Sequence, residues 1–187
     1  MHSAEPDHDV RTLTLEAFAD TIIPGEKRHP EDRAVAGVST GGGAVAAGAV
    51  PILETPEGGM EGALDDLAVA LNGHARAYCA SHDLEPDPAL PFVGLSYDHR
   101  TALVQQLVSP DHPEKMMWVG VAMFSYMAFD TGAHMHTTEA LAAGHPGLRT
   151  LGFADPDEDG LWRFPQYSYG RQLADIHPDT DATGSPS

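Results

Sequence analysis

The chain has 187 residues, 42% of them hydrophobic, so it is large and apolar enough to fold as one domain around a core. Its 10 basic and 28 acidic residues give a formal net charge of −18, which excludes binding to nucleic acids and anionic membrane surfaces. The single cysteine, Cys79, excludes an internal disulfide. The polar start lacks a secretory signal pattern, and the longest apolar run, residues 116–129, is shorter than a membrane span of ~20 residues. We therefore expect a soluble cytoplasmic protein.

The first predicted helix covers residues 14–23. Pro24 lacks an amide hydrogen and Gly25 permits a left-handed turn, so the helix ends there. Asp20 and Thr21 lie in its last turn, where short polar side chains bond to the amides of the following loop, so we predict a structural role for both. Apolar side chains form one stripe along this helix at three- and four-residue spacing: Leu15, Phe18, Ala19, Ile22 and Ile23.

The loop after this helix, residues 26–33, holds Lys27, Arg28 and Arg33, which are three of the ten basic residues. It is either a solvated loop or a contact for an anionic ligand or partner. Residues 37–50 are rich in glycine and alanine, but they lack the Lys-Ser/Thr pair of a phosphate-binding loop and the spacing of a dinucleotide fingerprint. We therefore predict a turn that leads into a short, closely packed helix.

Three longer helices are predicted over residues 60–81, 97–108 and 115–143. Ser96 is expected to cap the second helix, and the third is expected to bend near Gly132. The start of the third helix is apolar on all sides, which is typical of a central helix or of one covered by a partner. The predicted core contains Phe18, Ile22, Leu67, Leu71, Leu103, Leu107, Trp118, Val121 and Phe124.

These patterns predict an all-α protein: a single-domain helical bundle with a short C-terminal β-hairpin or irregular segment. We expect a flexible arm over residues 1–10 and the helical domain over residues 11–170. Residues 171–187 form a disordered acidic tail in this prediction, because apolar residues are scarce there. The hairpin is predicted over residues 153–164, around an acidic turn.

Asp130, His134 and His136 belong to the densest group of potential metal ligands and acid–base residues. On one continuous helix Asp130 and His134 share a face, whereas His136 and Glu139 share another, so this helix alone does not build a four-ligand site. The first interpretation is structural, with carboxylates that orient the imidazoles. The alternative is a stand-alone enzyme with Asp130, His134 and His136 as catalytic residues. A metal there would need further ligands from elsewhere in the chain, such as His74, His99 or His145.

The acidic segment 155–160 matches the first half of a calcium-binding loop, with Asp155, Asp157 and Asp159 at alternating positions before a glycine. The bidentate glutamate expected at the twelfth position is absent, because Gln166 stands there. An Asp-Gly turn between two short strands explains the same residues. We therefore expect no metal in this segment.

The segment after this turn alternates aromatic and polar residues. Its aromatic side chains either cover one side of the bundle or anchor a partner, since exposed aromatic residues concentrate in interfaces. The chain has no dinucleotide fingerprint and no cysteine pattern for haem or iron–sulfur clusters, so we expect no cofactor in this chain. The candidate interface residues are Trp162, Phe164, Tyr167 and Tyr169.

Two segments carry a resemblance to a known family. Residues 19–25 read Ala-Asp-Thr-Ile-Ile-Pro-Gly, and residues 144–153 read Gly-His-Pro-Gly-Leu-Arg-Thr-Leu-Gly-Phe after the last predicted helix. The chain resembles a divergent branch of the gluconate 2-dehydrogenase subunit 3 family in this opening motif and in the closing Leu-Gly-aromatic run. The similarity covers most of residues 12–153, and its motif residues are Asp20, Thr21, Pro24 and Gly25.

The resemblance implies an all-helical small subunit that binds no flavin itself. Such a subunit packs on and stabilises a large flavin-dependent oxidoreductase of the glucose-methanol-choline type, whose FAD acts on an alcohol or sugar-like substrate. Two other classes stay open, namely the stand-alone enzyme described above and a non-catalytic interaction module. Metal analysis of the purified protein tests the enzyme, and co-purification with a yellow flavoprotein tests the subunit.

Overall fold

The computed structural model describes residues 6–155 and 179, and this part of the chain is helical and contains no strand. This confirms the predicted all-α fold. A long loop separates the first two helices, and two single-turn 3-10 helices, η1 (Pro56–Gly58) and η2 (Glu61–Ala63), precede the third. The α-helices are α1 (Pro6–Ile22), α2 (Ala49–Leu53), α3 (Leu64–Ser81), α4 (Pro91–Gly94), α5 (Tyr97–Leu107), α6 (Lys115–Thr131), α7 (Thr137–Ala142) and α8 (Pro146–Thr150).

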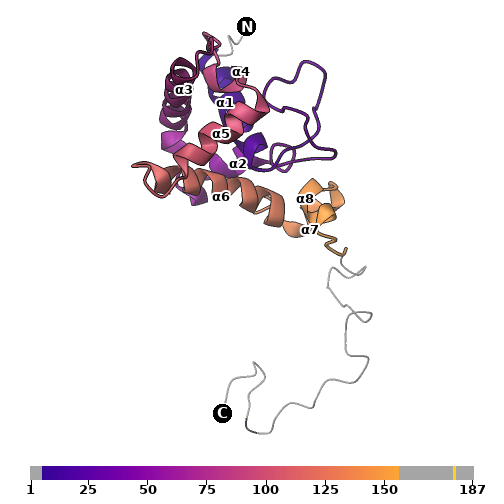
Figure 1. Ribbon diagram of the computed structural model, residues 1–187. Helices are drawn as coiled ribbons and strands as arrows, with labels where there is room; N and C mark the ends of the chain where they lie inside the picture. Colours follow the sequence, from indigo (N-terminus) through magenta and orange to yellow (C-terminus); the bar gives the residue numbers. More distant parts are fainter. Residues whose placement is uncertain (1–5, 156–178, 180–187) are drawn as a thin grey trace. The chain divides into compact units, whose positions relative to one another are not determined.

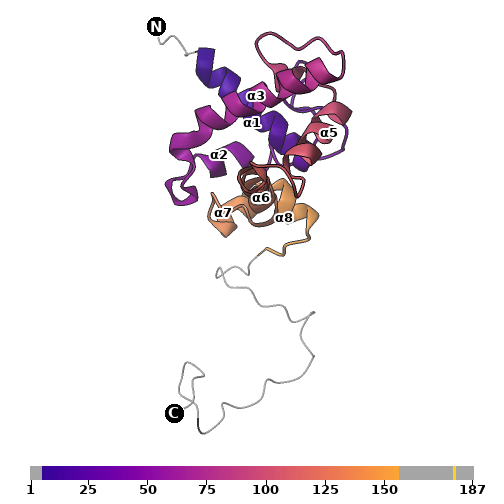
Figure 2. The same cartoon turned by 60° about the vertical axis from the view of Figure 1, so that its left-hand side comes forward.

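The central helix is α1, which packs against α2, α3, α4, α5 and α6. In Figure 1, α3, α4 and α5 lie around it in the upper part of the bundle, and α6 runs across the lower part. Helices α2 and α8 both contact α6, and α7 contacts α8. Figure 2 shows α6 nearly end-on, with α7 and α8 beside it. Helix α6 therefore lies between the central helix and the short C-terminal pair.

Three large rings meet in the core, Phe18 from α1, Phe92 from α4 and Trp118 from α6. The ring centroid of Phe18 is 5.8 Å from that of Trp118 and 6.5 Å from that of Phe92. All three side chains are at most 1% exposed, and burial of such large apolar surfaces is the main stabilising term of a small domain. Seven of the nine predicted core residues are buried, and Ile22 and Phe124 are partly buried against the same cluster.

Two predicted helix boundaries are wrong. Helix α1 begins at Pro6, so residues 6–10 are helical although they are predicted as part of an arm. Proline suits the first turn of a helix, where its missing amide hydrogen costs nothing. A single bent helix over residues 115–143 is also not formed, because α6 ends at Thr131 and α7 is a separate helix. Gly132 has a φ of 57°, and this left-handed conformation terminates α6.

Contacts divide the chain into two units, Met1–Phe153 and Ala154–Ser187, and all the described helices lie in the first. The predicted domain boundary at residue 170, the tail over 171–187 apart from residue 179, and residues 156–164 of the predicted hairpin lie outside the described residues. No helix in the described residues is long and apolar enough to cross a lipid bilayer.

Candidate functional site

Asp20 joins the end of α1 to two separate points of the following loop. Its Oδ1 atom accepts a hydrogen bond from Gly25 N at 3.1 Å, and its Oδ2 atom accepts one from Ala36 N at 2.8 Å. Asp20 is only 1% exposed, and burial raises its pKa above the usual value while the two amides oppose that shift. Both donors are amides of the loop that follows α1, as the sequence predicts for Asp20. Thr21 differs, because its Oγ1 donates to Ala17 O within α1 at 2.8 Å.

The segment after α1 crosses the glycine-rich segment at close range. Ala44 N donates a hydrogen bond to Ile23 O at 2.9 Å across this crossing. A Cβ atom added to Gly25 would overlap the backbone of Gly43, and one added to Gly43 would overlap the backbone at Ile23. These two glycines are therefore required by the close approach of two backbone segments.

The loop over residues 26–33 is held by an ion-paired turn. Arg28 donates to both carboxylate oxygens of Glu16 on α1, at 2.5 and 2.7 Å, and its Nε donates to Asp32 at 2.7 Å. Asp32 also accepts from the amides of Ala34 and Val35, each at 3.2 Å. Burial alone would raise the pKa of Asp32, but the hydrogen bonds from Arg28 and the backbone outweigh it and hold the pKa well below its usual range.

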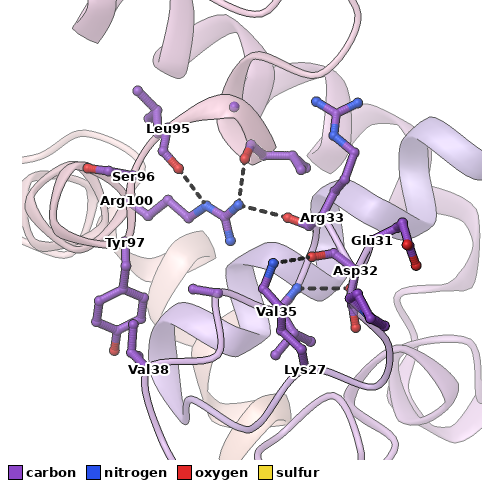
Figure 3. A pocket seen from close by; sticks show the side chains of 14 residues that line it. Lys27, Glu31, Asp32, Arg33, Val35, Val38, Leu95, Ser96, Tyr97 and Arg100 are labelled. Atoms are coloured by element: carbon purple, nitrogen blue, oxygen red, sulfur yellow. Dashed lines mark hydrogen bonds between the residues drawn. The ribbon is translucent and has the colours of Figure 1, made fainter.

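Arg100 on α5 holds the same loop from the opposite side and is 3% exposed. Burial lowers the pKa of its guanidinium, and the charge of Asp20 opposes that shift. We call Asp20, Asp32 and Arg100 the loop clamp, because each of them binds backbone groups of residues 25–36. The Arg100 guanidinium donates to the carbonyl oxygens of Ala34 (2.7 Å), Arg33 (3.0 Å), Leu95 (3.2 Å) and Val93 (2.5 Å), and Figure 3 shows the bonds to Arg33 and Leu95.

A cavity of about 620 Å³ opens beside the loop clamp and is lined by Lys27, Arg33 and Arg100 (Figure 3). The Lys27 ammonium donates to Asp32 O at 3.0 Å, and the Arg33 guanidinium donates to the carboxylate of Asp87 at 2.7 Å. Each of the three cations that line this cavity therefore already has acceptors within the protein. The cations of the loop act here as structural partners.

Among the described residues, Asp130, His134 and His136 do not form a three-ligand cluster. Asp130 is exposed in the last turn of α6, and His136 is exposed and shares a hydrogen bond of 2.8 Å with Thr138 Oγ1. His134 follows the break after α6, so it does not continue the helix face that carries Asp130. Its ring centroid lies 6.3 Å from that of His145, and burial together with this neighbour lowers the pKa of His134.

The second segment that carries the family resemblance also has a packing role. His145 caps α8, because its Nδ1 accepts a hydrogen bond from Leu148 N at 3.3 Å. Its Nε2 lies 3.1 Å from Ala47 O, which ties α8 to the segment before α2. A Cβ atom on Gly147 would overlap the carbonyl of Phe129 on α6, so only glycine fits this crossing.

Within the described residues, potential metal ligands converge at His74, His112 and Glu114, whose ligand atoms all lie within 4.8 Å of one another. His74 belongs to α3, Glu114 is the N-cap residue of α6, and His112 lies in the turn before it. Glu114 Oε2 lies 2.7 Å from His74 Nε2 and accepts a hydrogen bond from Trp118 Nε1 at 3.0 Å. The bond from Trp118 and then that from His74 lower the pKa of Glu114, so it is a carboxylate at neutral pH. We call His74, His112 and Glu114 the histidine corner.

Sequence reasoning names His74 as one of several distant ligands and does not identify His112 or Glu114. A local signal exists, because His112 and Glu114 form a His-x-Glu pair directly before a helix. The contact between His74 and Glu114 spans 40 residues of sequence and has no local signature.

The remaining predicted site residues follow the last described helix in the sequence. Asp155 is exposed, and the other two carboxylates of the predicted calcium segment lie outside the described residues. The same holds for the aromatic residues predicted as an interface: Trp162, Phe164, Tyr167 and Tyr169.

The fold is that of a small all-α protein, and it contains two groups of polar side chains, the buried loop clamp and the partly exposed histidine corner. The model of a family of unknown function, DUF5987, matches residues 9–187, so the chain belongs to that family. No curated protein and no solved structure matches the chain.

Proposed function

We propose that this protein is an accessory small subunit, without catalysis of its own, that packs on and stabilises a large flavin-dependent oxidoreductase. The partner would be of the glucose-methanol-choline type and would carry the FAD that acts on an alcohol or sugar-like substrate. The resemblance of residues 19–25 and 144–153 to the gluconate 2-dehydrogenase subunit 3 family supports this proposal. Both segments hold helices and loops in place, as expected of a scaffold.

The observation that carries the proposal is an exposed apolar strip on α6. Met116, Met123 and Met127 are 77%, 57% and 40% exposed, and Tyr126 beside them is 51% exposed. At 100° per residue the three methionines fall within about 40° of one another on the helix surface and span about 16 Å. They therefore lie along one side of α6, the side that faces solvent.

Such a strip is unusual on an acidic, water-exposed surface. The opposite side of α6 buries Trp118 and Val121 in the core, so the helix is apolar on both sides. Methionine and tyrosine are enriched in the buried centres of protein interfaces, where flexible thioethers fit an irregular partner surface. A large partner that covers this strip explains why methionines, and not charged residues, occupy these three exposed positions of α6.

The test is co-expression with a large flavin-dependent oxidoreductase encoded beside this gene. We expect a yellow complex to co-purify, and we expect the protein alone to be colourless and without redox activity. The double variant Met123→Glu/Met127→Glu should lose the complex while it keeps its fold. Val69→Glu on α3 is the matched control, because Val69 is 71% exposed and lies outside the strip.

Two results would overturn the proposal. One is turnover of a substrate by the protein alone, which would favour the stand-alone enzyme. The other is a stable, folded protein that forms no complex with any neighbouring oxidoreductase. A complex that survives the double variant but is lost in Val69→Glu would keep the subunit role and move the interface away from α6.

A further inference from the structure

The histidine corner combines three potential metal ligands from two elements that are distant in sequence. His74 projects from α3, while His112 and Glu114 come from the turn that leads into α6. Imidazole nitrogens and a carboxylate oxygen are the donors that Zn²⁺ and related divalent transition metals take in open, three-ligand protein sites. The ligand set therefore has the right chemistry before its geometry is considered.

Ligand access is provided by a cavity of about 200 Å³, lined by His74, Tyr78 and His112 among others. The side chains of His74 and Glu114 are 29% and 42% exposed, so an ion and a water molecule can reach them. A structural core pair would be sealed from solvent, whereas this group lies at the edge of a cavity.

The carboxylate of Glu114 is oriented by a rigid second layer. Trp118 is completely buried, and its Nε1 donates to the same Oε2 atom that meets His74. The His74 ring packs edge-on against Trp118 with centroids 5.8 Å apart. Outer partners of this kind fix metal ligands in place and lower the cost of ordering them on binding.

We propose that His74, His112 and Glu114 bind one divalent transition metal ion, with Zn²⁺ as the best match, and leave a fourth position open toward the cavity. Ligand atoms around tetrahedral zinc are about 3.3 Å apart, since the bonds are about 2.0–2.1 Å long. The separation of 2.7 Å between His74 and Glu114 would open by about 0.6 Å, and the widest pair, at up to 4.8 Å, would close by at most about 1.5 Å. We expect rotations of the partly exposed side chains to make both changes.

Metal binding would replace two hydrogen bonds of the histidine corner. A neutral imidazole has a single lone pair, so His74 binds the ion through Nε2 only as the tautomer with its proton on Nδ1, and its hydrogen bond with Glu114 is lost. His112 Nδ1 accepts a hydrogen bond from Glu114 N at 3.2 Å, and the same rule means that His112 gives up this bond when it becomes a ligand. Each imidazole therefore exchanges one hydrogen bond for a bond to the ion.

The experiment uses the full chain without a histidine tag, freed of metal with a chelator and titrated with Zn²⁺. We expect one ion per chain, a rise of Tm with zinc and, with Co²⁺, the intense visible absorption of a four-coordinate site. His112→Ala and Glu114→Gln should each weaken zinc binding at least about tenfold. His136→Ala is the matched control, because His136 is an exposed histidine of the other predicted ligand group.

Two ligand variants, His112→Ala and Glu114→Gln, decide whether the bound zinc lies at the histidine corner. The His112 side chain accepts one hydrogen bond, from Glu114 N, and packs edge-on against the His74 ring at the edge of the fold, so His112→Ala should fold even if His74→Ala does not. Zinc binding that is unchanged in His112→Ala and Glu114→Gln would overturn the proposal, as would the absence of stoichiometric zinc in the wild-type protein. The titration needs no oxidoreductase partner, so its failure leaves the proposed subunit role untouched, and failure of the complex leaves the metal site untouched.

Discussion

The loop clamp and the histidine corner both contain ionisable side chains, but their surroundings differ. In the clamp, Asp20 and Arg100 are at most 3% exposed and are bound to backbone amides and carbonyls. In the corner, His74 and Glu114 are partly exposed and border a cavity. Buried groups whose hydrogen bonds go to the backbone determine the path of the chain. Partly exposed groups whose lone pairs converge are able to exchange their partners for a ligand.

The distinctive sequence motif and the candidate ligand site lie in different parts of the molecule. The segment 19–25 is the most distinctive of the sequence, and Asp20, its only charged residue, holds a loop. The corner has only a short His-x-Glu pair as a local signal, and it has the geometry of a ligand site. The predictions below test this division, from the largest expected effect on stability to the smallest.

The largest effect is expected for Arg100→Met. The substitution removes a buried guanidinium and leaves four carbonyl groups without their donor, so the free energy of unfolding should fall by about 4 kcal/mol. Urea denaturation followed by circular dichroism measures the change. Arg76→Met on the exposed side of α3 is the control and should change stability by less than about 0.5 kcal/mol. A loss below about 1 kcal/mol in Arg100→Met would contradict the clamp.

Asp20→Ala should destabilise the protein by about 3 kcal/mol, because the amides of Gly25 and Ala36 lose their acceptor inside the protein. Asp20→Asn keeps one acceptor oxygen and should lose less. Asp130→Ala, an exposed aspartate on α6, is the control with an expected change within about 0.5 kcal/mol. In a complex with the proposed partner, Asp20→Ala should reduce assembly without removing a chemical step. Normal stability and assembly with lost catalysis would show that Asp20 is functional.

The two aspartates of the clamp should respond to pH in opposite directions. The pKa of Asp32 is lowered in the folded state, so its stabilisation is complete above the unfolded value of about 3.9 and is lost as the pH falls further, through the folded pKa. The pKa of Asp20 is raised, so its ionised form costs stability at neutral pH, and this cost disappears as the pH falls through the raised pKa.

Urea midpoints between pH 7 and pH 3 check this prediction. The stability difference between wild type and Asp32→Asn should shrink below about pH 4, whereas the difference between wild type and Asp20→Asn should grow in favour of wild type as the pH decreases from neutral. Parallel pH profiles for the two pairs would mean that the two carboxylates do not differ as described.

The smallest effect on stability is expected in the corner without metal. His112→Ala should change the free energy of unfolding by less than about 0.5 kcal/mol, because His112 is partly exposed and accepts one local hydrogen bond. With zinc at a hundred times its dissociation constant, wild type should gain about 2.7 kcal/mol and the variant much less. Thermal unfolding with and without zinc measures both values. A large loss without zinc would make the corner a structural element like the clamp.

Much of the helical structure was predictable, because periodicity, caps and stops are local. The apolar spacing on α3 and α5 identifies the buried Leu67, Leu71, Leu103 and Leu107. Ser96 caps α5 by accepting from His99 N at 3.3 Å, as its position in the sequence predicts. The start of α1 and the break at Gly132 were missed, because a proline is compatible with a first helical turn and a glycine is compatible with a bend or an end.

The sequence by itself determined an acidic, all-α chain, its apolar helix faces and the end of α1 at a Pro-Gly pair, since these depend on composition and on neighbours within a few residues. Only the tertiary structure decided what the polar residues do. Arg100 reaches Ala34 across 66 residues, and His74 meets Glu114 across 40. The physical reason is that the packing of α1, α3, α5 and α6 sets these distances. No local pattern encodes which partners two distant side chains find when their helices pack.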